Sequence, residues 1–570
     1  MTQCPQPQQP PEKILLLLMP FWDPEIPPQG ISCLKSYLTP HGYQVKTADG
    51  NTRKEFREAY FRYYRVLQNH IPVSRRQNLF NTGVILLRNH LMAHIYHTDK
   101  EQYYRFLKIL IEKTFCTPLD NNQLAELDGV IAQFYERVEH YFLGLLAEEK
   151  PTVVGFSAFS GSLPAALFAC RLAKQKSPDI KTVLGGQVFS DQLMVGTPDF
   201  DYFMEKTAAY VDGVIVGEGE QLFLAWLRGE LPTSKRVFTL QDIDNKAIDI
   251  DTAASPDYTD FDLSYYPHIA VYGSRSCPFQ CSFCSETVYW GKYRKKKIPQ
   301  LVEELKRLHE IHSTQLFLLT DSLLNPTVTE LATEISKSGY CFYWDGYLRA
   351  DPPVRKIDNT LLWRRGGFYR AKLGLESGSP KILQKMGKHI TIPQVKEAIY
   401  ALAYAGIKTT TAWMVGHPGE TEEDFLMTLA LIEELKDYIY EVKLQSFNYY
   451  LRGQPNSTSW IENQRPVLFY PEWAKDMLVC QTWRLDGEPT WEDTIRRVNR
   501  FMEHCRRLGL PSNYSLEDVN AADIRWKKLQ PNAVPALVDL QDKNNYIDEC
   551  KYIEKFNAAV NPPAEDGDWL

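Results

Sequence analysis

Short apolar runs alternate with helical spacing near the start of the chain. Ile14 to Pro20 is an apolar run typical of a strand buried on both faces, Gly30 to Leu38 has helical spacing, and Tyr43 to Ala48 is a second short strand. From Thr52 to about Glu149 the spacing is helical throughout, and the alternation then resumes with short strands at 152–157, 182–184 and 213–216. This pattern predicts a parallel α/β sheet with a helical insertion.

A second α/β series follows an acidic, proline-containing linker. Six strand–helix units in roughly 190 residues predict a partial barrel, because a complete barrel needs eight. The expected fold is therefore α/β. It has a Rossmann-like domain at 1–250 with a helical insertion at about 52–150, a linker at 251–265, a partial (β/α)6 barrel at 266–455 and a mainly helical C-terminal domain at 456–570.

Composition, charge and cysteine content limit the kinds of protein that this chain can be. The 570 residues, 44% of them apolar, are enough for several cores, and the net charge of −7 without long single-sign blocks gives no reason to expect a nucleic-acid partner. The longest apolar run, Ile14 to Met19, is far shorter than the ~20 residues of a membrane span. Eleven cysteines, an odd number, indicate a reducing compartment, so a cytoplasmic enzyme is expected.

The strongest chemical signal is the segment GSRSCPFQCSFCSE. It places Cys277, Cys281 and Cys284 in a C-x3-C-x2-C triplet after the first strand of the second series. Thiolates are preferred ligands of iron–sulfur clusters and zinc, and three of them on a four-iron cluster leave one iron open to a chelating ligand. A structural zinc ion, which would need a fourth ligand, and free core cysteines remain as alternatives.

The triplet, with the aromatic Phe283 before its last cysteine and the partial barrel around it, resembles the radical S-adenosylmethionine (SAM) superfamily. The resemblance implies a [4Fe-4S] cluster whose open iron binds SAM. It also implies reductive cleavage of SAM to a 5′-deoxyadenosyl radical that abstracts hydrogen, and a flavodoxin- or ferredoxin-type reductant.

Further motifs fall where this family places its SAM contacts, each after a predicted strand. They are Asp321 in TDSLLN, Arg349 in YLRAD, Glu376 and Ser377 in LGLESGS, and Gly416, Pro418 and Gly419 in MVGHPGET. Carboxylates and hydroxyls at strand ends can hydrogen-bond ribose or ammonium groups, and the glycines leave room for adenine. For any one of them, capping of a helix or turn is the alternative.

The first α/β series resembles the cobalamin-binding domains that are fused to such barrels. The residues that carry this resemblance are Ser157, Phe159, the pair Gly185 and Gly186, and the GEGE segment with Gly217, Glu218 and Gly219. Asn51 stands where cobalamin mutases carry their cobalt-ligating histidine, so the resemblance implies a cobalamin without that ligand. A related domain that holds no cofactor is the alternative.

Aromatic residues gather near the end of the barrel and beyond it. Tyr449 and Tyr450 end the sixth strand, and Phe469, Tyr470 and Trp483 follow. They are candidates for the wall of a substrate pocket, with packing between helices as the alternative.

Three functions fit these observations. The first is a cobalamin-dependent radical SAM methyltransferase acting on an unactivated carbon of a peptide or small-molecule natural product. The second is an enzyme with the same cofactors that performs cyclisation, rearrangement or oxidation. The third is a non-catalytic, metal-bound interaction scaffold.

Overall fold

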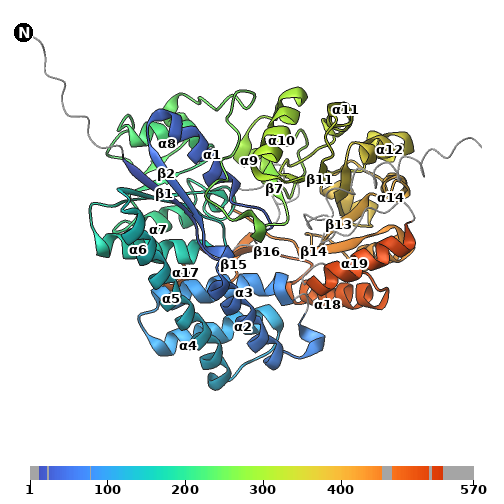
Figure 1. Cartoon of the computed structure of the whole chain (residues 1–570). Helices are drawn as coiled ribbons and strands as arrows, with labels where there is room; N and C mark the ends of the chain where they lie inside the picture. The colour runs from blue at the N-terminus through green and yellow to red at the C-terminus, as the bar shows by residue number, and fades with distance from the viewer. Residues whose placement is uncertain (1–11, 22–24, 77–78, 452–464, 513–515, 531–570) are drawn as a thin grey trace, which may run out of the picture.

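The computed structural model describes residues 12–21, 25–76, 79–451, 465–512 and 516–530. The parts of the expected C-terminal domain at 456–464, 513–515 and 531–570 lie outside the described residues. Within the described part, two parallel sheets lie side by side and a group of helices lies below them (Figure 1).

The first sheet has six parallel strands in the order β2-β1-β3-β4-β5-β6. Their bounds are β1 Lys13–Leu18, β2 Gln44–Asp49, β3 Val153–Ser157, β4 Lys181–Gly185, β5 Gly213–Ile215 and β6 Val237–Phe238. The strand order reverses at β1, which is the topology of a doubly wound sheet. Such sheets bind ligands at the carboxyl ends of the strands beside the reversal, here β1 and β3.

Helices cover both faces of this sheet, so its central strands are largely apolar. In β1 every residue after Lys13 is buried. The covering helices are α1 Gln29–Leu38, α6 Leu163–Lys176, α7 Pro198–Lys206 and α8 Gly219–Leu227.

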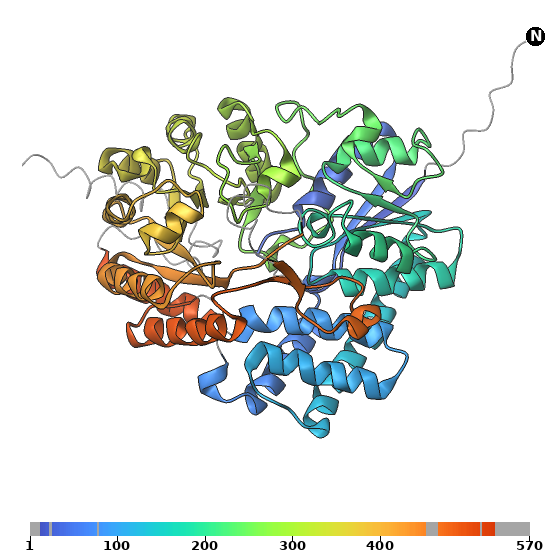
Figure 2. The same ribbon diagram turned by 180° about the vertical axis from the view of Figure 1, so that it is seen from behind.

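The helical insertion consists of four helices between β2 and β3. They are α2 Lys54–His70, α3 Leu79–Tyr96, α4 Lys100–Phe115 and α5 Asn121–Glu149. Asp120 begins α5 with a reciprocal capping box to Gln123, and α5 packs on α2 and α6. Figure 2, the opposite view, again places the insertion below both sheets. The insertion is thus one wall of the space between them.

The second sheet also has six parallel strands, in the order β14-β13-β12-β11-β10-β7. Neighbouring strands of this sheet are also consecutive along the chain, except that β8 and β9, between β7 and β10, form a separate two-stranded sheet. The strands are β7 Ile269–Val271, β10 Leu316–Leu319, β11 Tyr343–Leu348, β12 Phe368–Glu376, β13 Lys408–Val415 and β14 Glu441–Ser446. The connecting helices are α10 Ile298–His312, α11 Val328–Ser338, α12 Ile357–Arg365, α13 Pro380–Lys385, α14 Ile392–Tyr404 and α15 Glu422–Leu435. The prediction of an α/β fold with a partial six-stranded barrel is confirmed.

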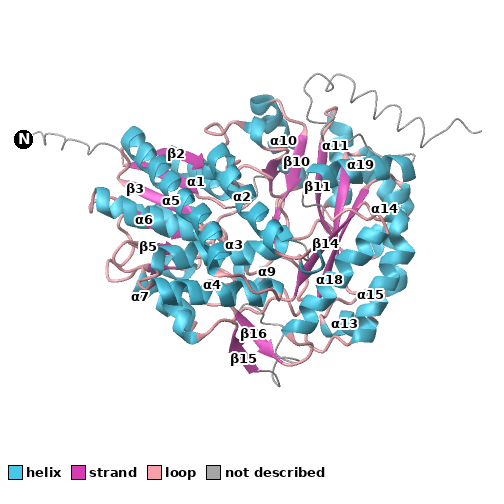
Figure 3. Cartoon of the chain, turned by 90° about the horizontal axis from the view of Figure 1, so that it is seen from below, coloured by secondary structure: helices cyan, strands magenta, loops and turns pink. Residues whose placement is uncertain are grey.

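The described segment after the barrel is mainly helical, as expected, and it also holds two strands that the sequence did not indicate. It contains an antiparallel hairpin of β15 Arg465–Leu468 and β16 Trp483–Asp486, as well as the helices α17 Lys475–Leu478, α18 Trp491–Arg507 and α19 Leu516–Leu529. Trp483 forms a bridge to Tyr449 at the barrel exit and donates from Nε1 to Asp199 on α7 at 2.6 Å. In Figure 3 these two strands lie apart from both sheets. The hairpin forms because other parts of the chain offer it partners, which local periodicity does not report.

The linker is fixed in place rather than loose. Asp260 accepts from Lys46 Nζ at 2.9 Å and pairs with Lys35 Nζ at 2.8 Å, and Tyr266 donates to Asp49 at 2.8 Å. Its acidic side chains therefore bind the first domain. No described helix is long and apolar enough to cross a membrane.

Candidate active site

The cysteine triplet lies on the loop that leaves the first strand of the barrel. This loop runs from the ribbon strand β8 (Ser274–Arg275), which pairs with β9 (Arg294–Lys295), to the short helix α9 (Glu286–Trp290). Ser282 ties the loop to the barrel, since its N–H donates to Met386 O at 2.9 Å and its hydroxyl donates to Lys385 O at 3.1 Å. The three cysteines are therefore held at the barrel mouth.

The three thiols suit an iron–sulfur cluster. All three are free and half-buried, and burial raises the pKa of Cys277 and raises that of Cys284 to about 12. A cluster must therefore displace their protons as it binds. Arg349 Nη1 lies 3.7 Å from Cys281 Sγ, and hydrogen bonds to ligand sulfur are one of the ways in which a protein tunes such a centre. No three His, Cys, Asp or Glu side chains of the described residues are grouped to hold a single metal ion.

Arg349, which follows β11, links the cluster loop to the segment after α13. Its guanidinium lies 3.8 Å from the centre of the Phe279 ring, pairs with Asp351 at 3.3 Å and donates to the carbonyl of Lys388. Arg349 is thus placed beside the thiol of Cys281.

Glu376 and Ser377 end the fourth strand in an unusual backbone conformation. Glu376 has a φ of +67°, and the β12–β13 register shifts between Gly374 and Glu376. Its carboxylate accepts from Lys388 Nζ at 2.7 Å, and a Cβ on Gly374 would lie 2.7 Å from that carboxylate. A non-glycine residue held at positive φ is a mark of functional sites. Ser377, also buried, accepts from the N–H of Ser379 at 3.1 Å.

Asp321, which follows β10, is directed toward the protein rather than toward the mouth. It is 1% exposed, and its carboxylate accepts from the N–H of Gly273 at 2.8 Å and from the hydroxyl of Ser274. Burial raises its pKa to about 6. The structure therefore gives Asp321 an anchoring position at the base of the cluster loop.

The raised pKa of Asp321 predicts a pH effect on stability. Unfolded Asp loses its proton near pH 4 and the folded residue near pH 6, so the unfolded state is favoured progressively as pH rises between these values. We expect the free energy of unfolding of the native protein, relative to Asp321→Asn, to fall by about 2–3 kcal/mol across this window and to stay constant above it. Urea titrations at pH 4.5, 5.5, 6.5 and 7.5 measure this, and parallel curves for the two proteins would contradict it.

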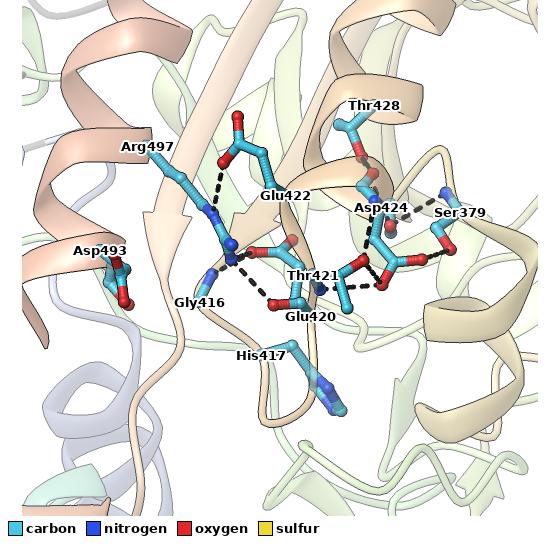
Figure 4. A network of polar contacts seen from close by, with 12 residues as sticks. Ser379, Gly416, His417, Glu420, Thr421, Glu422, Asp424, Thr428, Asp493 and Arg497 are labelled. Atoms are coloured by element: carbon cyan, nitrogen blue, oxygen red, sulfur yellow. Dashed lines mark hydrogen bonds and ion pairs between the residues drawn. The ribbon is translucent and has the colours of Figure 1, made fainter. Parts of the chain in front are cut away.

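The turn after β13 is held by a polar network that reaches α18 (Figure 4). Gly416 has a φ of +83°, and its N–H donates to Glu420 at 2.9 Å. Arg497 of α18 donates to the same carboxylate at 2.9 Å. A Cβ on Gly416 would lie 2.5 Å from the side chain of Thr494, so only glycine fits this turn.

Two neighbours of Gly416 complete the turn. Burial lowers the pKa of His417 to about 4, so this imidazole is neutral at pH 7. Pro418 lines the cavity described below. The network of Figure 4 thus fixes the backbone at the edge of the barrel mouth.

The residues predicted to contact cobalamin lie along the carboxyl edge of the first sheet. Ser157 is the last residue of β3 and Phe159 follows it, while Gly185 is the last residue of β4 and Gly186 follows it. Gly186 has a φ of +114°, and a Cβ there would lie 2.6 Å from the carbonyl oxygen of Ala158, so the two loops cross closely. Beside Gly217, with a φ of +95°, there is open space. Small residues and open backbone at this edge fit a large ligand.

Two of the predicted cobalamin residues are engaged with protein partners. The Asn51 amide donates to Asp49 at 2.7 Å. Glu218 pairs with Arg275 at 3.2 Å and also with Arg294, both from the cluster side. Gly219 begins α8, and Glu220 on the same helix pairs with Arg275 at 2.7 Å. The GEGE segment therefore carries ionic contacts between the two domains, which its sequence did not reveal.

One cavity of about 320 Å³ joins the two domains. Its lining includes Ser160, Asp191 and Gln192 from the loops after β3 and β4, and Gly416 and Pro418 from the turn after β13. The predicted aromatic residues also line it, namely Tyr449, Tyr450, Phe469, Tyr470 and Trp483. The helical insertion contributes Arg88, which no sequence motif marked. The ligand-binding edges of both sheets thus face one space.

Comparison with protein families agrees with this geometry. The model of the radical SAM superfamily matches residues 271–432, and that of the B12 binding domain matches residues 130–227. The chain contains a radical SAM domain and a B12 binding domain. The two domain families imply a [4Fe-4S] cluster, SAM and cobalamin.

Curated relatives of this chain have different activities. One, at 29% identity over 309 residues, is the anaerobic magnesium-protoporphyrin IX monomethyl ester cyclase of Rubrivivax gelatinosus, with 48% of this chain and 52% of that protein covered. Another, at 24% over 314 residues, is the hopanoid C-3 methylase of Methylococcus capsulatus, with 50% and 56% covered. The chain spans about half the length of these relatives.

The fold is also found in a solved structure. TsrM of Kitasatospora setae, a radical SAM methyltransferase solved with cobalamin and a [4Fe-4S] cluster bound, superposes with a TM-score of 0.57 over 96% of this chain and 100% of that chain. At 13% sequence identity, this shows a shared architecture.

Proposed function

We propose that this radical SAM protein transfers a methyl group to a carbon atom of a small molecule or peptide. The observation that carries the proposal is a cavity lined by carboxyl-end loops of both sheets. A corrin bound at the first sheet would face a SAM molecule bound at the second, with the cavity between them. The cofactors would together supply hydrogen abstraction and a transferable methyl group.

The chain's own residues would hold these groups. Cys277, Cys281 and Cys284 would bind the cluster. Arg349, Glu376, Ser377, Gly416 and Pro418 are the residues that we assign to the SAM side, with Asp321 anchoring the cluster loop. Ser157, Phe159, Gly185, Gly186 and Gly217 are those that we assign to the corrin side.

Two of the polar contacts described above hold side chains and backbone in place at the barrel mouth. The Glu376–Lys388 pair neutralises both charges within the barrel, and the hydrogen bond of Gly416 fixes the backbone beside the cavity. Aromatic residues and the insertion line part of the cavity wall, and a substrate bound there would displace water from the space where a reactive radical would act. We include in the proposal a flavodoxin- or ferredoxin-type reductant and a reducing, cytoplasmic setting, since the nine described cysteines are all free.

The proposal is tested with anaerobically reconstituted protein loaded with hydroxocobalamin. SAM carrying a trideuterated methyl group is added with a reductant, and nucleoside products are quantified by mass spectrometry. We expect both 5′-deoxyadenosine and S-adenosylhomocysteine, because methyl transfer from SAM leaves the latter. A protein that makes neither product in the presence of both cofactors would refute the proposal.

A second function, ring formation without methyl transfer, is favoured by one observation. The cyclase of Rubrivivax gelatinosus matches this chain at 29% identity, and the methylase of Methylococcus capsulatus matches it at 24%. The same assay separates the two, since 5′-deoxyadenosine without S-adenosylhomocysteine would support the cyclase-like reaction.

A further inference from the structure

The cavity between the two domains carries an arrangement of polar groups that none of the predicted cofactor motifs explains. Its volume of about 320 Å³ lies at the lower end of the range for small-molecule sites, roughly 300–1,000 Å³. Its charged lining residues are Arg88 from α3, Arg484 from β16, Asp191 from the loop after β4 and the exposed Glu488 at the rim.

Gln481 lines the cavity with an unsatisfied amide. The residue is only 7% exposed, and neither Nε2 nor Oε1 has a hydrogen-bond partner among the described residues. A buried polar group left unpaired costs about 1–3 kcal/mol. Since Gln481 presents both a donor and an acceptor, the space beside it suits a ligand with a polar group.

In the described part of the chain Arg88 forms no ion pair with a carboxylate, although its charge acts on the nearby carboxylate of Asp191. Its guanidinium donates to the side-chain oxygens of Asn89 at 3.2 Å, Gln192 at 2.8 Å and Thr482 at 3.2 Å, and all three acceptors are uncharged. These contacts hold the guanidinium in place without neutralising it. Arginine presents several N–H donors in a rigid plane, which matches a carboxylate.

Arg484 places a second guanidinium at the same cavity. Its Nε is buried without a hydrogen-bond partner in the described part of the chain, and the group lies 5.7 Å from the centre of the Phe469 ring. Asp191 is the one acid among the cavity's described lining residues that is not exposed. The two guanidinium groups therefore outnumber the enclosed carboxylate.

The remaining walls are largely aromatic. Tyr449 and Tyr450 come from the barrel exit, Phe469 and Trp483 from the hairpin, and Trp491 from the start of α18. Flat apolar walls of this kind favour a ring or another flat apolar group. Cations, an unpaired amide and aromatic walls thus meet in one space.

We propose that this cavity binds the substrate and that the substrate is a carboxylate-bearing molecule with a flat apolar part. Arg88 and Arg484 bind the carboxylate, Gln481 hydrogen-bonds a neighbouring polar group, and the aromatic residues enclose the apolar part. The inference deepens the proposed function and rests on it, because it identifies the space between the two cofactors as the substrate site.

The test measures binding and needs no turnover. The probes are 3-(indol-3-yl)propanoate and its primary amide, titrated calorimetrically into protein loaded with cluster and cobalamin. We expect the acid to bind at least tenfold more tightly than the amide. In Arg88→Gln the acid should lose at least tenfold in affinity while the amide changes less than threefold, so the preference disappears. Arg65→Gln changes an exposed arginine of α2 on the same insertion. It is the matched control and should retain the preference for the acid.

Arg484→Gln provides an independent variant and should also reduce the preference for the acid. Equal binding of acid and amide to the native protein would overturn the proposal, as would an unchanged preference in both variants. Loss of bound hydroxocobalamin in the variants, with the preference retained, would assign the cavity to the corrin instead. A failure of the proposed function appears separately, as missing SAM products from the native protein.

Discussion

Replacing Cys281 with alanine is expected to abolish SAM cleavage. The three thiols of the cluster loop are the only ligands that the loop offers, and the loop is fixed to the barrel through Ser282. With two thiols left, the cluster cannot be held and SAM has no reductant at the site. We expect iron and sulfide contents near zero after reconstitution and a fall of at least 1,000-fold in 5′-deoxyadenosine, measured by mass spectrometry.

The corrin site should survive this change, because Cys281 lies on the barrel side. Bound hydroxocobalamin, read from its absorbance, should therefore equal that of the native protein. Cys341→Ala is the matched control, since Cys341 is another half-buried cysteine of the barrel, placed at the start of β11 away from the carboxyl ends of the strands. It should keep both cluster and activity. SAM cleavage that persisted in Cys281→Ala would mean that the triplet does not hold the cluster.

The second large effect is expected from Arg275→Met. Arg275 is 7% exposed and pairs with Glu218 at 3.2 Å and Glu220 at 2.7 Å, which join the first domain to the cluster loop. Methionine retains much of the packing between Tyr272 and Trp290 but leaves Glu220 without its arginine. Removing one partner of a buried ionic group costs about 3–5 kcal/mol. We expect a loss of this size in the free energy of unfolding, measured by urea titration with tryptophan fluorescence.

Two further variants show whether the loss of the ionic contact causes the fall in the free energy of unfolding. Arg228→Met removes the exposed pair with Glu230, where the two side chains are 46% and 57% exposed, and should change the free energy by less than about 1 kcal/mol. The triple variant Arg275→Met, Glu218→Gln, Glu220→Gln should recover part of the loss, because no uncompensated carboxylate remains. A single variant as stable as the native protein would contradict the predicted role of this ionic contact.

The parts of the candidate site that lie close together along the chain could be predicted from the sequence. The spacing of Cys277, Cys281 and Cys284 places three thiols on one loop whatever the rest of the chain does. The alternation of apolar runs and helical spacing predicted the α/β fold and the six-stranded partial barrel, because each strand and helix buries a face of fixed period. The motifs with Glu376 and Gly416 were found because each follows its own strand directly.

Other features could not be predicted from the sequence, because they depend on contacts between residues that are distant along the chain. The sequence predicted a mainly helical C-terminal domain and did not indicate the hairpin at 465–468 and 483–486, which forms where Trp483 meets Tyr449 and Asp199. The acidic linker was expected to be loose, and Lys35 and Lys46 fix it. Glu218 was interpreted from its resemblance to cobalamin domains, and its pairing with Arg275 became visible only in three dimensions.

The sequence by itself therefore determined the order of elements, the placing of three cysteines on one loop and the two domain families, since periodicity and short spacing suffice for these. Only the tertiary structure decided which side chains share a space. Arg88, Asp191, Gln481 and Tyr450 come from four separate segments, and their meeting depends on how the insertion, the two sheets and the hairpin pack. The proposed recognition of a substrate depends on such long-range packing, because charge and hydrogen bonding act over a few ångströms whatever the separation in sequence.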